Sequence, residues 1–140
     1  MTQIKMLIGL VLILLNSVCF AADTQVIVQA RLIEIPGTMP PNELYNYVYV
    51  MKYKVEKVIE GKLEVQEILV GQYNPLMSRS QLAGPLKDKV SGDVDKFKVG
   101  AKQTLTLVSL EKNWDGAVED EFFDDEDSIR WLAIKSMKLP

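Results

Sequence analysis

The stretch Y-N-Y-V-Y-V-M-K-Y-K-V at Tyr45–Val55 is the clearest indication of fold in this chain. Its large side chains stand at every second position, and residues with that spacing share one face of a β-strand. The opposite face changes from Val48 and Val50 to Lys52 and Lys54. The pattern therefore predicts a strand that starts buried on both faces and ends with one face in water.

The sequence on both sides of this strand also has strand character. After it, Glu60–Lys62 predicts a turn, and Glu64–Tyr73 reads as the antiparallel return strand. Before it, Thr24–Ile35 is rich in β-branched residues, and a loop with Pro40 and Pro41 follows. Three consecutive antiparallel strands are the expected start of the domain.

The second half of the chain adds two more strands. Residues 74–99 carry scattered proline and glycine, which predicts an irregular connection with a short helical turn at 78–83. Gln103–Leu110 alternates as a strand, and Ile129–Leu139 is interpreted as the closing strand, although its spacing also allows a short helix. The chain is expected to be all-β, a small five-stranded OB-like barrel or sandwich after an N-terminal signal helix.

The first residues have the pattern of an export signal. Lys5 precedes a run of about ten apolar residues, Met6–Leu15, whereas about 20 are needed to span a bilayer. Small residues follow, so cleavage is expected between Ala21 and Ala22. The prediction is a signal peptide at 1–21 and a single β-rich domain at 22–140, exported to the periplasm or secreted, with no stable membrane span after processing.

Two other interpretations of this leader stay open. The first is an uncleaved membrane anchor, because a few more apolar residues would make the run long enough to span a bilayer. Cys19 is a lipid attachment site if it is read as the end of a lipobox, but Val18 and Asn16 depart from that pattern.

Composition excludes several chemistries. The 140 residues include no histidine and one cysteine, so a Ser-His-Asp triad, a Cys-His pair and imidazole metal ligands are ruled out. Ser78 and Ser80 therefore have no histidine to activate them. Residues 1–21 hold one lysine and no acid, so removing them changes the net charge from −3 to −4. An acidic domain is not expected to bind nucleic acid, and no catalytic residue is assigned.

An acidic run is the most unusual local feature. Clustered carboxylates can bind calcium, and the candidate ligands here are Asp120, Asp124, Asp125 and Asp127. Their spacing does not match an EF-hand, and blocks of like charge usually remain hydrated. A solvated loop is therefore the favoured interpretation, with calcium as the one cofactor left open.

The aromatic residues suggest a ligand surface. OB-type barrels bind oligosaccharides on their sheet, and sugars stack on exposed rings. The alternation of Tyr47, Tyr49 and Tyr53 is more typical of a core. Tyr73, Arg130 and Trp131 are kept as candidate ligand-binding residues.

Two segments carry a family resemblance. Val55–Lys62 reads V-x-K-V-x-x-G-K and leads to Ile68–Val70, while Phe97–Leu107 combines an F-x-x-G turn with L-x-L. The chain resembles netrin-like and TIMP-like modules of the OB type, although it lacks their disulfide cysteines. It is more similar to exported bacterial domains found beside SGNH-type acyl-hydrolases of alginate-like O-acetylation systems.

The second resemblance includes particular residues. Asp124 and Asp125 followed by Arg130 and Trp131 match an acidic segment before an R-aromatic strand, whereas Gly71–Tyr73 stands where that family often has His-Trp-Gly. The resemblance implies an accessory role in extracellular polysaccharide modification.

The expected function is an exported, non-catalytic binding or accessory domain of the cell envelope. Its partner would be an envelope protein or a polysaccharide. The alternatives are a small enzyme that acts on a glycan through acidic residues, and a calcium-stabilised structural module.

Overall fold

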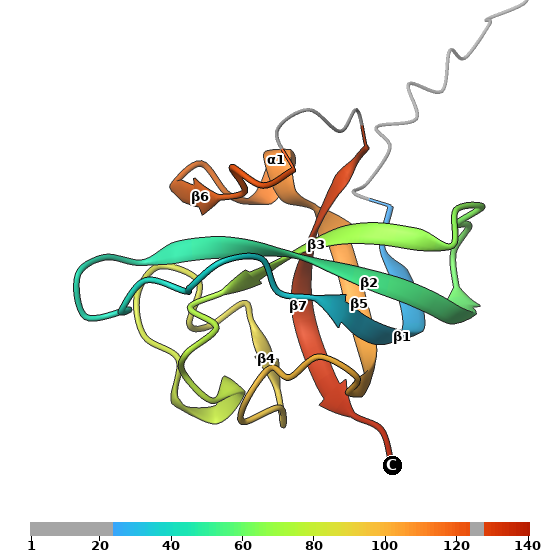
Figure 1. Cartoon of the computed structure of the whole chain (residues 1–140), viewed down its shortest axis with the longest axis horizontal. Helices are drawn as coiled ribbons and strands as arrows, with labels where there is room; N and C mark the ends of the chain where they lie inside the picture. Colours follow the sequence, from blue (N-terminus) through green and yellow to red (C-terminus); the bar gives the residue numbers. More distant parts are fainter. Residues whose placement is uncertain (1–23, 124–127) are drawn as a thin grey trace, which may run out of the picture.

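The computed structural model describes residues 24–123 and 128–140, which form a closed five-stranded β-barrel (Figure 1). Its strands are β1 (Val26–Glu34), β2 (Tyr47–Glu60), β3 (Glu67–Tyr73), β5 (Lys102–Ser109) and β7 (Arg130–Lys138). The barrel closes in the order β1-β2-β3-β7-β5-β1, with β3 and β7 parallel and the other neighbours antiparallel. This arrangement confirms the all-β, OB-like prediction.

Strand β2 joins the two halves of the barrel because it is 14 residues long. Its first half pairs with β3, from Val48↔Tyr73 to Lys54↔Glu67, and its second half pairs with β1 as far as Ile27↔Glu60. Register shifts in the β1–β2 ladder mark irregularities of the kind that bend a strand. The observed strand runs past Val55 to Glu60, and its partner begins at Glu67, later than the predicted Glu64.

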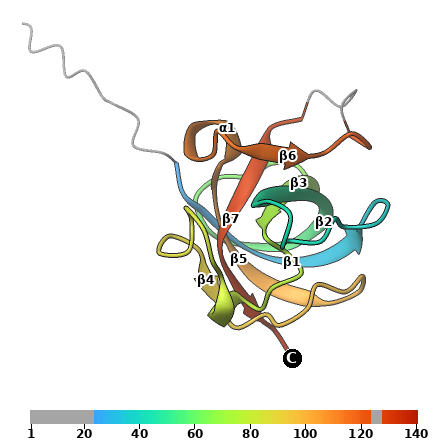
Figure 2. The same cartoon turned by 90° about the vertical axis from the view of Figure 1, so that its left-hand side faces the viewer.

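Four short elements lie outside the five strands of the barrel. A 3-10 turn at Arg79–Gln81 lies inside the predicted helical turn, and β4 (Ser91–Gly92) pairs with β7. On the other side lie α1 (Leu110–Asn113) and β6 (Ala117–Glu119), which runs parallel to β2. Figure 2 shows α1 and β6 at one end of the molecule and β4 at the other. The C-terminal segment is a strand, so its alternative as a short helix is wrong.

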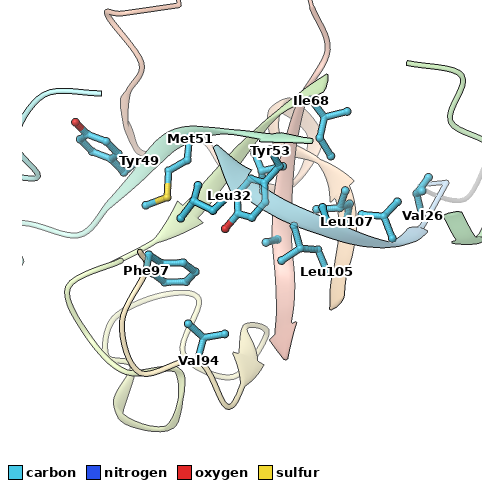
Figure 3. Packing of buried hydrophobic residues seen from close by; sticks show 14 of the residues in the cluster. Val26, Leu32, Tyr49, Met51, Tyr53, Ile68, Val94, Phe97, Leu105 and Leu107 are labelled. Carbon is cyan, nitrogen blue, oxygen red and sulfur yellow. The ribbon is translucent and has the colours of Figure 1, made fainter. Parts of the chain in front are cut away.

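The barrel interior is filled by the side chains that alternate inward from each strand (Figure 3). Tyr47, Tyr49 and Tyr53 of β2 are buried there, which confirms the core interpretation of the tyrosine pattern, whereas Tyr45 remains 40% exposed. The irregular connection closes one end of the interior with Val94 and Phe97.

A polar network also lies inside the barrel. The Tyr53 hydroxyl donates to Gln103 Oε1 at 2.8 Å and accepts from Gln72 Nε2 at 3.3 Å. Ser136 Oγ in turn donates to Gln72 Oε1 at 3.3 Å. All four residues are buried away from water, so their polar groups form hydrogen bonds with one another instead.

A second apolar cluster covers the outer face of the sheet. Val48, Val50, Leu69 and Leu132 point outward from β2, β3 and β7 into this cluster. They are covered by side chains from residues 82–90 and 110–123, namely Leu82, Leu86, Val90, Leu110, Trp114, Val118 and Phe123. The barrel wall therefore has apolar packing on both sides along β2 and β3.

Candidate binding groove

The sheet face that OB-folds commonly use for ligands is occupied here by the chain itself. OB-folds bind oligonucleotides and oligosaccharides on the face of their second and third strands, between two loops. In this protein that face carries the second apolar cluster, and the Lys52 Nζ lies 5.2 Å from the centroid of the Phe123 ring above it. This part of the sheet face is therefore not open to a ligand.

The largest of the described cavities is a groove between the β2–β3 turn and the start of β7. Its volume is about 580 Å³, which is within the usual range for ligand sites. Val65 and Ile129 are 56% and 69% exposed. We call this site the β3–β7 groove; it is lined by Lys62, Leu63, Glu64, Val65, Glu67, Ile68, Ser128, Ile129 and Trp131.

The groove lies where the parallel ladder between β3 and β7 has not yet begun. The β3–β7 ladder begins at Leu69↔Arg130, so in the described part of the chain no ladder position joins Glu67 or Ile68 to β7. Ser128 and Ile129 precede the strand and lie on the opposite wall. In Figure 1 the β2–β3 turn lies at the right and β7 begins near the upper centre.

The base of the groove is part of the barrel. Leu63 and Trp131 both pack against the interior core, so the apolar surface continues from the groove into the fold. Gly61 holds the adjoining turn with a φ of +83°, in the left-handed region that favours glycine. A Cβ on Gly61 would lie 3.0 Å from the Gln25 carbonyl oxygen, so this turn packs closely against the start of β1.

The rim of the groove carries charge. Lys62, Glu64 and Glu67 are exposed, and no ion pair joins them to another residue of the described part of the chain. Two acids and one base leave the rim with an excess of negative charge. The groove thus combines an apolar base with exposed carboxylates.

The structure places the three predicted ligand-binding residues in different surroundings. Trp131 lines the groove, but the Arg130 guanidinium is bound to the Asp120 carboxylate and lies 3.8 Å from Glu111 Oε1. Tyr73 is fully buried, and its hydroxyl donates to the Ala83 carbonyl at 2.7 Å. A ring buried in this way offers no face to a ligand.

The acidic candidates are only partly described. Asp120 is paired with Arg130, while Asp124, Asp125 and Asp127 lie outside the described residues, as do Ala21 and Ala22. Across residues 24–123 and 128–140, no three carboxylate or thiol side chains come together as a metal site would require. The same ranges contain no helix that is long and apolar enough to cross a membrane.

A smaller pocket lies beside β6. It measures about 160 Å³ and is lined in part by Tyr49, Glu119, Glu121 and Phe122. The Tyr45 hydroxyl donates to Glu119 Oε1 at 2.5 Å, and this bond raises the pKa of Tyr45 above its ordinary value. This pocket is small, and its exposed apolar lining is limited to one ring, Phe122.

Most residues of the groove were not predicted from the sequence. Leu63 and Val65 alternate with Lys62 and Glu64, which is also the pattern of an ordinary half-buried strand. Only Trp131 was singled out. The signal that could have pointed to the groove was the pair of alternating apolar residues, Leu63 and Val65, directly after the turn at Gly61.

Comparison with known proteins found no relative of this chain. No family model, no curated protein and no solved structure matches this chain. The likeness to netrin-like modules and to domains of O-acetylation systems therefore stays a prediction.

Proposed function

We propose that this chain is an exported, non-catalytic binding domain of the cell envelope that contacts a protein partner through the β3–β7 groove. The observation that carries the proposal is the exposure of Val65 and Ile129 on opposite walls of a cavity whose base includes Trp131. Apolar side chains grouped in a concave site with a charged rim are typical of binding surfaces.

The chemistry of the groove favours a polypeptide over a sugar. Its apolar lining consists of four aliphatic side chains and one aromatic ring, which is itself partly buried. Sugars stack on exposed aromatic faces, whereas aliphatic side chains pack well against other aliphatic side chains. An envelope protein is therefore preferred to a polysaccharide as the partner.

The absence of histidine from the sequence supports a role without catalysis. Ser78 Oγ lies 3.1 Å from Ser80 Oγ, and a second hydroxyl is no base for a serine nucleophile. Export rests on the leader pattern at 1–21. A protein with this leader would meet its partner in the periplasm or outside the cell.

Site-directed photo-crosslinking in living cells tests the proposal. A photoreactive residue at position 65 is compared with one at position 99, because Val65 and Val99 are 56% and 60% exposed. We expect a discrete crosslinked envelope protein from position 65 only, and we expect the additional substitution Ile129→Asp on the other wall to abolish it. Equal products from both positions, or none from position 65, would overturn the proposal.

A further inference from the structure

We propose that the end of the barrel that carries β4 docks on the surface of a lipid bilayer rich in anionic phospholipids. The inference goes beyond the proposed function, because it concerns a different surface from the β3–β7 groove and a different kind of partner. Docking of this kind would hold the domain at a membrane while the groove stays free for the envelope protein.

The first observation is a cluster of lysines at this end. Residues 86–102 and 135–140 lie together, because β4 pairs with β7 at Ser91↔Lys135 and the Leu139 N–H donates to the Lys102 carbonyl. We call this surface the basic end; its exposed charged side chains are seven lysines and three aspartates, namely Lys87, Lys89, Lys96, Lys98, Lys102, Lys135, Lys138, Asp88, Asp93 and Asp95. The basic end thus has four more positive than negative side chains, in a chain whose net charge is −3.

Most of these lysines are not neutralised by the fold. Lys102 forms an ion pair with Glu56, and Lys138 forms one with Asp95. The other five lysines form no ion pair within the described part of the chain. A lysine ammonium is a compact, strongly hydrated point charge, so these side chains favour a diffuse anionic surface over a fixed bidentate contact.

The second observation is that the opposite end of the barrel is acidic. The β5–β7 ladder joins the two ends, from Gln103↔Lys138 at the basic end to Ser109↔Trp131 at the other. At that other end, five acids stand against Lys112 and Arg130, namely Glu111, Asp115, Glu119, Asp120 and Glu121. Figures 1 and 2 show β4 at one end of the molecule and α1 and β6 at the other. The two signs of charge are therefore segregated along the barrel.

Segregated charge favours a plane over a flexible polymer as the partner. An anionic plane attracts the basic end and repels the acidic end at the same time, so it orients the whole molecule. A polymer that contacts only the lysines makes no use of the acidic end. The cavity that includes Lys102 measures about 220 Å³, which is below the usual range for a ligand site, so it is a poor seat for such a chain.

The basic end has little apolar surface. Val99, which is 60% exposed, is the one exposed large hydrophobic side chain in residues 86–102 and 135–140. A protein interface has an apolar core, and an amphipathic helix in a membrane buries an apolar face; the basic end offers neither. Attachment would therefore be electrostatic and peripheral, and salt would weaken it by screening the charges.

This orientation leaves the groove accessible. Strand β7 begins at Arg130, between the groove residues Ile129 and Trp131, and it ends at Lys138 in the basic end. The groove and the basic end thus lie at opposite ends of a nine-residue strand. A domain that rests on a membrane by its basic end would present the groove away from the bilayer.

Co-sedimentation with vesicles tests the proposal. The protein, purified in the form that an expressing bacterium exports, is mixed with vesicles of phosphatidylglycerol and phosphatidylcholine in equal parts, or of phosphatidylcholine alone. We expect binding to the anionic vesicles to be at least about tenfold tighter at about 0.02 M NaCl, and to fall to the level of the neutral vesicles at about 0.3 M. The neutral vesicles also measure any binding through the leader.

Matched charge reversals locate the surface. Lys98→Glu and Lys135→Glu each reverse one charge of the basic end, whereas Lys112→Glu makes the same change at the acidic end. We expect each of the first two to weaken binding to anionic vesicles at least about fivefold, and Lys112→Glu to weaken it less than about twofold. All three variants should melt within a few degrees of the parent, since the three lysines are exposed.

Fluorescence quenching measures the orientation. A fluorophore is attached to Ser91→Cys in β4 or to Ser128→Cys beside the groove, both exposed positions, in a Cys19→Ser background. The anionic vesicles carry a nitroxide quencher on the lipid headgroup. We expect quenching at position 91 to exceed quenching at position 128 at least about twofold, because the fields of charged headgroups act only close to the surface.

Three results would overturn the proposal. Equal losses for Lys112→Glu and Lys135→Glu would show that only net charge matters, and equal quenching at positions 91 and 128 would show that no end faces the bilayer. Binding to polygalacturonate, a polymer of acidic sugars, without binding to anionic vesicles would indicate an acidic polysaccharide instead. None of these results bears on the groove, whose test is crosslinking from position 65.

Discussion

The guanidinium carbon of Arg79 lies 5.0 Å from the centroid of the Phe97 ring, inside the connection that closes one end of the barrel. Arg79 is buried, and its Nη2 donates to the carbonyls of Asn74 at 2.8 Å and Met77 at 3.1 Å. Its Nε and Nη1 have no hydrogen-bond partner in the described part of the chain. One side chain thus organises an irregular loop through ring and carbonyl contacts.

Arg79→Ala should lower the free energy of unfolding by about 2–4 kcal/mol, because it removes two buried hydrogen bonds and the contact with Phe97. Arg79→Met should lose less, since its chain still packs on the ring and no charge is buried. Urea unfolding of the parent and the two variants measures this. An alanine variant within about 0.5 kcal/mol of the parent would contradict it.

Tyr45 and Tyr49 share one face of the segment Tyr45–Val55, but they differ in burial. Tyr49→Ala removes a buried ring and should cost about 2–4 kcal/mol, whereas Tyr45→Ala removes a ring that is 40% exposed and should cost less than about 1 kcal/mol. Thermal and urea unfolding compare the two variants. Equal losses would show that Tyr49 does not act as a core residue.

Gly92 and Gly100 both have positive φ angles, 135° and 95°, but only Gly92 is sterically confined. A Cβ on Gly92 would lie 2.0 Å from the Ser136 carbonyl oxygen, whereas nothing lies within 4 Å at Gly100. Gly100→Ala should cost about 1–3 kcal/mol through backbone strain, and Gly92→Ala should cost at least about 2 kcal/mol more. Similar melting temperatures for the two variants would be inconsistent with the β4–β7 pairing.

Alkaline pH should destabilise the fold through its buried tyrosines. Burial raises the pKa of Tyr47 to about 12 and also raises the pKa of Tyr53, whereas an unfolded tyrosine titrates near 10. Above pH 10 the unfolded chain releases protons that the folded chain retains, so stability is complete below pH 10 and falls toward pH 12. Urea unfolding from pH 8 to 11 measures this fall.

Tyr47→Phe provides the control for that series. It removes one of the retained protons, so its stability should fall less steeply above pH 10 than that of the parent. Tyrosinate absorbance of the folded protein should show these residues ionising last. A free energy of unfolding that is constant from pH 9 to pH 11 would contradict the prediction.

Calcium should leave the melting temperature nearly unchanged. Asp120 is bound by Arg130, and the acidic run of the sequence is expected to remain hydrated. Replacing Asp124 and Asp125 by asparagine should likewise have little effect. A rise of several degrees with calcium that chelator reverses and these substitutions abolish would favour the calcium-stabilised alternative instead.

Part of the candidate site was accessible from sequence and part was not. Trp131 was a candidate, and with Arg130 it matches the R-aromatic strand of the family that the chain resembles. Tyr73 was an equally plausible candidate, yet its ring is buried under the second apolar cluster. The difference depends on which distant segments cover each face, and residues 82–90 cover Tyr73 from a part of the chain with little periodicity.

Local sequence patterns indicated four of the five strands of this protein, because side chains of a strand alternate regardless of what surrounds it. For Ile129–Leu139 the spacing also allowed a short helix, and the structure shows a strand. Local alternation also placed Tyr47, Tyr49 and Tyr53 in the core, whereas Tyr45 on the same face is 40% exposed. Tertiary structure alone decided that β3 and β7 pair in parallel, and that their ladder begins only at Leu69 and Arg130. The groove lies just before the start of that ladder, and its position depends on contacts between residues about 60 positions apart, which no local pattern encodes.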